Sequence, residues 1–200
     1  MAIEWNSRVN RAFVLRDAVD LTGVRLAELI GWPDARRRIE VREATAARRR
    51  GGTSSLVAAS VLDQRVDPYL ERSDVDMYLE VPDWDAAALV SVSHYMPRSE
   101  DPETGTFAWV TSHRTTVSQV LAIAATIALA ECGDGEVVDE YGYLSEERLN
   151  PPAELFGRLR VAQPQESLDA AVDDVLARTR LRRQFPGRGT PSAARPGGVA

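Results

Sequence analysis

The stretch Thr116-Val-Ser-Gln-Val-Leu-Ala-Ile-Ala-Ala-Thr-Ile-Ala-Leu-Ala-Glu131 carries the clearest structural signal in the chain. Thr116 and Gln119 have capping-box spacing, in which each side chain satisfies a free backbone N–H group of the other residue. Apolar residues fall on most faces of the expected helix, so residues 116–131 should form a helix buried in the core. Gly133 and Gly135 follow it and are expected to end it.

Strands are expected on both sides of this helix. Residues 107–111 form a short apolar run before it, and residues 136–139 read as a strand after it. Further upstream, residues 75–81 and 89–96 alternate between apolar and polar side chains, which is typical of half-buried strands. The polar loop at residues 98–106 predicts a long hairpin that joins the strands at 89–96 and 107–111.

Shorter elements complete the expected architecture. We expect strands at residues 12–15, 37–43 and 55–62, a helix from Asp20 or Thr22 to Ile30, a short helix capped by Asn150, and a last helix from Leu168 to about Arg183 capped by Ser167. The pattern predicts an α+β fold, with a largely antiparallel sheet, the buried helix (about 116–131) on one face and a C-terminal helix. Residues 8–184 should form a single domain, flanked by a loose N-terminus (1–7) and a disordered tail (185–200).

Composition excludes several classes of enzyme. The chain has 200 residues and a net charge of −6, and all 24 of its basic residues are arginine. Without lysine it cannot form a Schiff base or supply a P-loop lysine. Two histidines and one cysteine are too few ligands for a Cys/His zinc site, and no cofactor is expected. Cys132 lies among acidic residues, which should raise the pKa of its thiol and make it a poor nucleophile.

The location of the protein is predicted from the length of its longest apolar stretch, its first eight residues and its cysteine content. The longest apolar stretch, residues 120–130, is too short to cross a bilayer. The first eight residues lack the basic and then apolar layout of a signal peptide. A single cysteine also fits a reducing compartment. We therefore expect a cytoplasmic protein with no membrane partner.

Charge is distributed unevenly along the chain. Acidic residues dominate between Asp67 and Glu147, where only three arginines occur. Basic runs lie elsewhere, at Arg36, Arg37, Arg38, Arg48, Arg49 and Arg50, and in the acid-free stretch from Arg178 to Arg195. The two arginine runs are candidates for binding a polyanion, although they contain no stacking aromatic residue, so a nucleic acid partner is not favoured.

Asp74 and Asp76 form the first candidate site. An Asp-x-Asp pair on a strand places both carboxylates on one face, where they could hold a divalent metal for phosphoryl transfer. Ser73-Asp74-Val-Asp76-Met-Tyr-Leu resembles the metal-binding strand of nucleotidyltransferases. The Gly-Ser pair of that family has its nearest match at Gly52-Thr-Ser54, too far upstream. The alternative interpretation is a solvated strand face.

The second candidate site is the junction before the buried helix, where Ser112, His113, Arg114, Thr115 and Thr116 follow one another. Free amides at a helix N-terminus attract anions, and the histidine and arginine would strengthen that attraction. The alternative is that the hydroxyl groups only cap the helix. A pairing of the expected hairpin strands would also bring His94 near His113.

A resemblance covers residues 107–143. The segments Phe107-Ala-Trp-Val, Thr116-Val-Ser-Gln-Val-Leu-Ala-Ile-Ala and Gly135-Glu-Val-Val-Asp-Glu-Tyr-Gly-Tyr143 resemble a pattern found in small uncharacterised bacterial proteins and in some toxin-immunity domains. This resemblance implies an α+β domain that binds another protein and is not a catalyst. The favoured hypothesis is an immunity-type interaction protein that uses its acidic middle region. A nucleotidyltransferase-like enzyme and a polyanion-binding protein are the alternatives.

Overall fold

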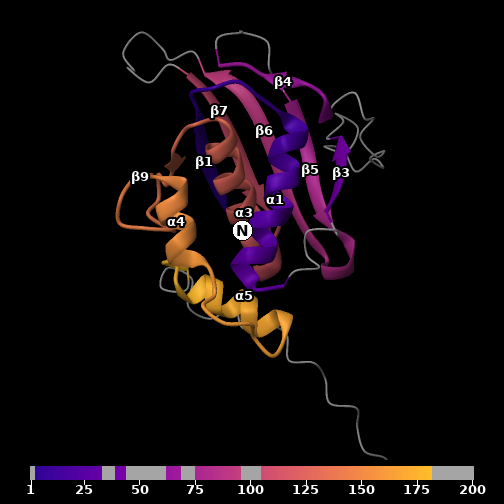
Figure 1. Cartoon of the computed structure of the whole chain (residues 1–200), viewed down its shortest axis with the longest axis vertical. Coiled ribbons are helices and arrows are strands. Elements are labelled where there is room, and N and C mark those ends of the chain that lie inside the picture. The colour runs from indigo at the N-terminus through magenta and orange to yellow at the C-terminus, as the bar shows by residue number, and fades with distance from the viewer. Residues whose placement is uncertain (1–2, 33–38, 44–61, 69–74, 96–104, 182–200) are drawn as a thin grey trace, which may run out of the picture.

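The computed structural model describes residues 3–32, 39–43, 62–68, 75–95 and 105–181 (Figure 1). Its strands are β1 (Glu4–Val9), β2 (Phe13–Val14), β3 (Glu40–Glu43), β4 (Arg65–Val66), β5 (Val75–Val81), β6 (Ala86–Tyr95), β7 (Gly105–Ser112), β8 (Val137–Val138) and β9 (Leu149–Asn150). Its helices are α1 (Leu15–Ile30), α3 (Thr116–Cys132), α4 (Pro152–Leu159), α5 (Leu168–Ala177) and the short 3₁₀ turn η3 (Pro82–Trp84).

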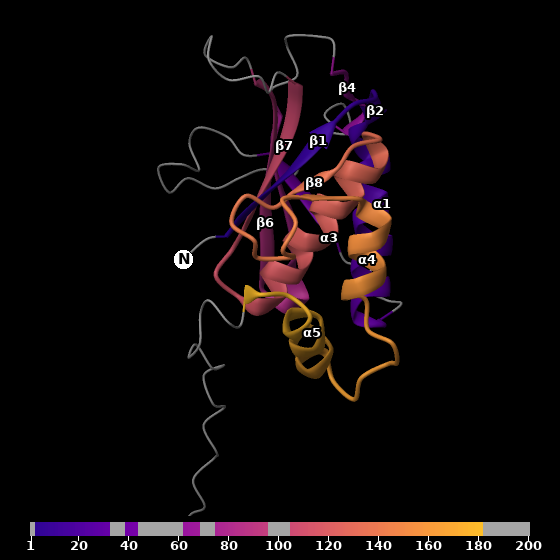
Figure 2. The ribbon, with the colours of Figure 1, turned by 90° about the vertical axis from the view of Figure 1, so that its left-hand side faces the viewer.

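Seven of the described strands form one antiparallel sheet in the order β3-β5-β6-β7-β1-β8-β9. Strands β2 and β4 pair separately. Helices α1, α3 and α4 lie on one face of the sheet, and α5 packs near one end of this helical layer (Figure 2). The expected α+β fold, with a largely antiparallel sheet and a buried helix on one face, is confirmed.

The core lies between the sheet and α3. Val75, Met77, Leu79 and Val81 of β5 are all buried, whereas the residues between them are partly exposed, as the alternation in the sequence predicts. Helix α3 is buried over almost its whole length because it contacts the sheet below and helices α1, α4 and α5 around it. The hydroxyl group of Ser7 donates to the Thr126 carbonyl at 2.7 Å and so ties β1 to the centre of α3.

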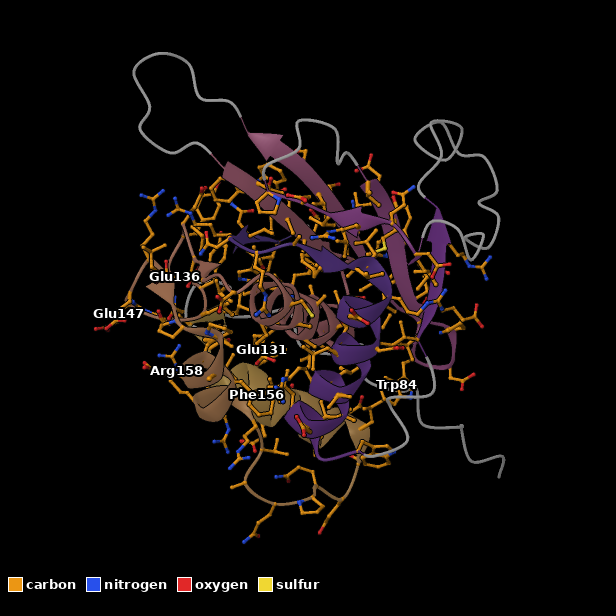
Figure 3. The ribbon with its side chains drawn as sticks, turned by 45° about the horizontal axis from the view of Figure 1, so that its top comes forward. Trp84, Glu131, Glu136, Glu147, Phe156 and Arg158 are labelled. Carbon is orange, nitrogen blue, oxygen red and sulfur yellow. The ribbon has the colours of Figure 1, made fainter. Side chains whose placement is uncertain are left out.

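An arginine joins three of the helices. Arg25 of α1 pairs with Glu131 of α3 at 2.7 Å and with Glu28 at 2.6 Å. Its guanidinium also lies 4.6 Å from the ring centroid of Phe156 in α4. Figure 3 shows Glu131 and Phe156 on neighbouring helices. Because this arginine is only 22% exposed, the contacts it makes fix α1, α3 and α4 against one another.

The N-terminus differs from expectation. Residues 4–7, expected to be loose, belong to β1, which lies between β7 and β8 inside the sheet. Trp5 is only 1% exposed, and Ile3 and Val9 are also buried. The physical reason is that Ile3, Trp5 and Val9 share one face of a strand and bury it against the helical layer.

Several expected boundaries also need correction. Helix α1 begins at Leu15, so it takes in residues expected to end a strand, and the last helix ends at Ala177 rather than near Arg183. Thr115, and not Thr116, caps α3 by accepting a hydrogen bond from the Ser118 N–H group. Asn150 does not cap α4, because its side chain donates to the Glu147 carbonyl. Ser167 does cap α5 as expected, through the Ala170 N–H group.

Two expectations fall where the structure gives no description. The strand expected at 55–62 lies almost wholly outside the described residues, and so does the tail at 185–200. Within the described part of the chain, no helix combines the length and apolarity that crossing a membrane requires.

Candidate interaction surface

A short connection between β8 and β9, residues 139–148, is held by several hydrogen bonds; we call it the tyrosine loop. Asp139 begins it and is only 2% exposed. The carboxylate of Asp139 accepts three backbone hydrogen bonds, from Tyr143 at 2.9 Å, Leu144 at 2.6 Å and Ser145 at 3.0 Å. One buried anion therefore folds the loop around itself, because bonds from N–H groups to a carboxylate are stronger than neutral ones.

Helix α4 and the segment after α5 hold the loop from outside. The Arg158 guanidinium donates to the Leu144 carbonyl at 3.2 Å, and the Arg180 N–H group donates to the Tyr143 carbonyl at 2.7 Å. The side chain of Leu144 is 1% exposed and anchors the middle of the loop in the core. The loop is therefore attached on both sides, and its shape does not depend on a ligand.

The braced loop presents apolar side chains to solvent. Tyr141 is 62% exposed and Leu149, at the start of β9, is 42% exposed; they are the two large hydrophobic residues that stand out in this way among the described residues. The ring of Tyr141 stacks on that of Tyr143, with centroids 5.4 Å apart and an interplanar angle of 26°. Gly142 sits between the two tyrosines with φ at 64°, a conformation that glycine adopts without strain.

Acidic residues are concentrated in the segment of the sequence that contains the exposed tyrosine. Residues 131–147 contain seven acidic residues and no basic one: Glu131, Asp134, Glu136, Asp139, Glu140, Glu146 and Glu147. Asp139 is used inside the loop and Glu131 pairs with Arg25, whereas Asp134, Glu140, Glu146 and Glu147 are exposed and Glu136 is partly exposed. Glu136 and Glu147 lie on the same side of the molecule, away from Trp84 (Figure 3). We call the exposed carboxylates of the tyrosine loop, Glu140, Glu146 and Glu147, its acidic rim; Arg148 of the same loop is also exposed.

The residues of the predicted anion site lie at the junction of β7 and α3, where the hydroxyl groups of Ser112 and Thr115 are hydrogen-bonded within the protein. Ser112 is 2% exposed, and its oxygen accepts from the Ile3 N–H group at 3.3 Å. Thr115 caps α3, while Thr116 is the first residue of that helix. His113 and Arg114 are the exposed members of the set. The geometry favours the capping interpretation over anion binding.

A shallow hollow of about 410 Å³ lies beside this junction, lined by Tyr78, Glu80, Pro82, Asp85, Ala86, Ala87 and His113. Glu80 and Asp85 contribute carboxylates to its wall, which oppose the entry of an anion. The carboxylate of Glu80 is also paired with Arg42 at 2.7 Å.

The two histidines do not meet. His94 pairs with Thr106 near one end of the β6–β7 hairpin, whereas the His113 N–H group bonds to the Ala87 carbonyl at the other end. These positions are seven residues apart along β6, which is about 23 Å on an extended strand. The expectation that His94 lies near His113 is therefore wrong.

Of the candidate residues for metal and polyanion binding, the structure describes only Asp76. Asp74 lies outside the described residues, and so do Arg36, Arg37, Arg38, Arg48, Arg49 and Arg50. The Asp76 carboxylate accepts a hydrogen bond from the Ser91 hydroxyl group at 2.6 Å. Among the described residues no group of three histidine, cysteine or acidic side chains is placed to hold a metal ion.

Cys132, at the end of α3, is expected to react slowly. Burial, and after it the negative charges of Asp17 and Glu131, raise the pKa of its thiol from 9.0 to about 11. The thiolate fraction at pH 7.5 should then be about 100-fold lower than for an ordinary cysteine. Alkylation by iodoacetamide should accelerate about tenfold per pH unit up to pH 10, with no plateau near 9.

The unfolded chain in urea provides the reference for this measurement, because its cysteine titrates normally. Equal rates for the folded and unfolded chains at pH 7.5 would contradict the raised pKa. The direction agrees with the sequence-based expectation, but burial contributes more than the acidic neighbours.

The tyrosine loop itself is the feature that sequence reasoning missed. Its local signal is Asp139-Glu-Tyr-Gly142, an aspartate and a glycine at turn spacing. Comparison with protein-family models, curated proteins and solved structures finds no match for this chain.

Proposed function

We propose that this chain is a non-catalytic, immunity-type protein-interaction module whose contact surface is the tyrosine loop and its acidic rim. The observation that carries the proposal is Tyr141, which is 62% exposed on a loop that a buried carboxylate has already ordered. Tyrosine is enriched among the residues that dominate binding energy at protein interfaces. A loop ordered in advance also loses little conformational entropy when it binds.

The charge of the rim indicates the kind of partner. Three exposed carboxylates, those of Glu140, Glu146 and Glu147, lie on the tyrosine loop beside one exposed arginine, Arg148, so the charged side chains exposed on the loop are net negative. Such a surface attracts a basic protein surface and accelerates its association. A toxin that acts on nucleic acid presents such a basic surface, so the resemblance to immunity domains is consistent with this partner chemistry.

The test begins with site-specific photo-crosslinking in cells. A photoreactive phenylalanine analogue is placed at position 141, and in a control protein at position 65, where the Arg65 side chain is 69% exposed on β4. We expect position 141 to capture one basic protein that position 65 does not capture. Equal capture at both positions would contradict the proposal.

Binding of the purified, identified partner then measures the role of the tyrosine. Tyr141→Ala should weaken binding about 30-fold, the equivalent of about 2 kcal/mol for a residue at the centre of an interface. Tyr78→Ala, which removes the same side chain from the distant strand β5, should change Kd less than about threefold. Isothermal titration calorimetry gives both values, and similar losses in the two variants would refute the assignment.

The metal-dependent alternative makes a different prediction. If Asp74 and Asp76 held a catalytic ion, titration of the full chain with Mg²⁺ or Mn²⁺ would show saturable binding that Asp76→Asn abolishes. Such binding together with metal-dependent phosphoryl transfer, and without a crosslinked protein, would replace the interaction hypothesis. Neighbouring genes offer a simpler indication, since a toxin gene beside this one favours an immunity role.

A further inference from the structure

We infer that the hollow beside η3 binds a small organic cation, an alkylguanidinium or alkylammonium ion that is free and not part of a protein. This inference goes beyond the proposed function, because the hollow and the tyrosine loop share no residue. The hollow lies against β5 and β6, and β7, β1 and β8 separate these strands from β9 in the sheet. Figure 3 shows Trp84 of η3 and Glu147 of the tyrosine loop at opposite sides of the molecule.

The turn between β5 and β6 forms the hollow. Asp85 closes the turn with φ at 47°, and its N–H group donates to the Pro82 carbonyl at 3.1 Å. Ala87 lies opposite Glu80 in the strand register, so a short side chain stands beside a long one and leaves space. The His113 N–H group donates to the Ala87 carbonyl at 2.9 Å and so holds the histidine at the wall. The volume of about 410 Å³ is in the range of small-molecule sites, about 300–1,000 Å³.

The carboxylates of the wall favour a cation. Glu80 and Asp85 both line the hollow, and Asp85 is exposed. The Glu80 carboxylate is paired with Arg42 at 2.7 Å, but the same guanidinium is also paired with Glu40 at 3.2 Å. One positive charge is therefore shared by two carboxylates on β3 and β5, and Asp85 adds a third negative charge.

The neighbouring charged residues do not reverse this balance. Asp83 on η3 and Arg114 after β7 are both exposed, and their charges are opposite. An imidazole adds positive charge only in its protonated form, so the cation should bind best above pH 7, where histidine side chains are mostly neutral. The described residues around the hollow are then net negative.

The lining fits an organic cation better than a metal ion. Among the residues that the structure describes, no three histidine, cysteine or acidic side chains are placed to hold a metal ion. The wall instead combines its carboxylates with the ring of Tyr78 and with the apolar side chains of Pro82 and Ala86. An aromatic ring attracts a cation placed over its face, and apolar side chains pack against a hydrocarbon stem. An alkylguanidinium ion offers both a charged head and such a stem.

Titration of the full chain with 1-butylguanidine, followed by amide NMR at pH 7.5 and low salt, tests the site. The amide peaks of Glu80, Asp85, Ala87 and His113 report on the hollow. We expect saturable shifts with half-saturation at about 1 mM, an ordinary affinity for a ligand of this size. 1-Butylurea has nearly the same shape without the charge and should bind about tenfold more weakly.

Two matched variants separate the wall of the hollow from general surface charge. Asp85→Asn removes one negative charge and keeps the backbone, because asparagine tolerates a left-handed φ. It should weaken the binding of 1-butylguanidine about tenfold. Asp134→Asn is the control, since Asp134 is also exposed and has φ at 49°, but lies at the opposite end of α3 from His113. Its Kd should stay within about twofold of the unchanged chain.

A third probe, N-acetylarginine methylamide, distinguishes the source of the cation, because it presents the guanidinium group as a protein side chain does. Weaker binding of this probe than of 1-butylguanidine supports a free ligand, whereas tighter binding would assign the hollow to a protein side chain and overturn the proposal. Absence of saturable shifts, equal binding of 1-butylurea, or equal losses in the two variants would overturn it as well. These measurements use no partner protein, so their outcome does not depend on the function proposed for the tyrosine loop.

Discussion

Gly135→Ala is expected to lower the free energy of unfolding by about 3 kcal/mol. Gly135 follows α3 where the chain returns to the sheet, and a Cβ atom there would overlap the Arg8 carbonyl oxygen of β1. Both segments at this contact are held by backbone hydrogen bonds. The Gly135 N–H group donates to the Ala130 carbonyl, and the Arg8 N–H group donates to the Glu136 carbonyl. Neither segment can move without breaking a hydrogen bond of the fold.

Urea denaturation followed by tryptophan fluorescence measures this loss, since Trp5 lies on the displaced strand and is 1% exposed. Gly157→Ala is the matched control, because a Cβ atom at this position in α4 has open space around it. That variant should gain about 0.5–1 kcal/mol from the higher helix propensity of alanine. Equal stabilities for the two variants would show that the close approach to β1 is not a constraint.

Asp139→Asn is expected to disorder the tyrosine loop and to lower the free energy of unfolding by about 2–4 kcal/mol. Asparagine has the same shape as aspartate but replaces one carboxylate oxygen with an NH₂ group. At least one of the three N–H groups of residues 143–145 then faces another donor in a buried site. Partner binding through Tyr141 should weaken together with the order of the loop.

Hydrogen exchange of the amides at residues 143–145 gives the local readout, and urea denaturation gives the global one. Asp134→Asn serves as the control, because Asp134 is exposed and lies just before β8, the strand that Asp139 follows. Its effect should stay within about 0.5 kcal/mol. Slow exchange at residues 143–145 in Asp139→Asn would contradict the role assigned to the buried carboxylate.

Long, strongly periodic segments of the fold were predictable from sequence. Residues 75–81 alternate over seven positions, and residues 116–131 are apolar over four helical turns, so each pattern admits few other structures. Boundaries were harder to predict where tertiary contacts override local preference. Phe13 and Val14 pair with β4, but the next residue, Leu15, already belongs to a helix that packs on α3.

The strand β1 shows why the pattern of apolar and polar residues can mislead. Its apolar positions Ile3, Trp5 and Val9 follow the two-residue period, but Ser7 interrupts the pattern at the position that bonds to α3. From sequence alone, a polar residue at such a position indicates a strand face that is exposed to solvent. Only the neighbouring Thr126 carbonyl, more than a hundred positions away, explains it.

The candidate surface was predictable only as a charge pattern. Sequence reasoning found an acidic middle region, because charge is visible without a structure. It could not find the ordering of the loop, because the loop is held by residues 158 and 180, which no local spacing connects to Asp139. Likewise the hydroxyl of Ser112 looked available until the β7–β1 pairing placed Ile3 beside it.

The place of β1 within the sheet has a consequence for synthesis on the ribosome. This strand emerges before its partners β7 and β8, which begin about 100 and about 130 residues later. Until β7 and β8 emerge, β1 with its Trp5 has neither of its neighbours in the sheet. The sheet can therefore form only after these distant segments of the chain have been synthesised. Cells that lack the chaperone holding nascent apolar segments should therefore accumulate this protein as aggregates during rapid translation, even though the finished sheet encloses β1 on both sides.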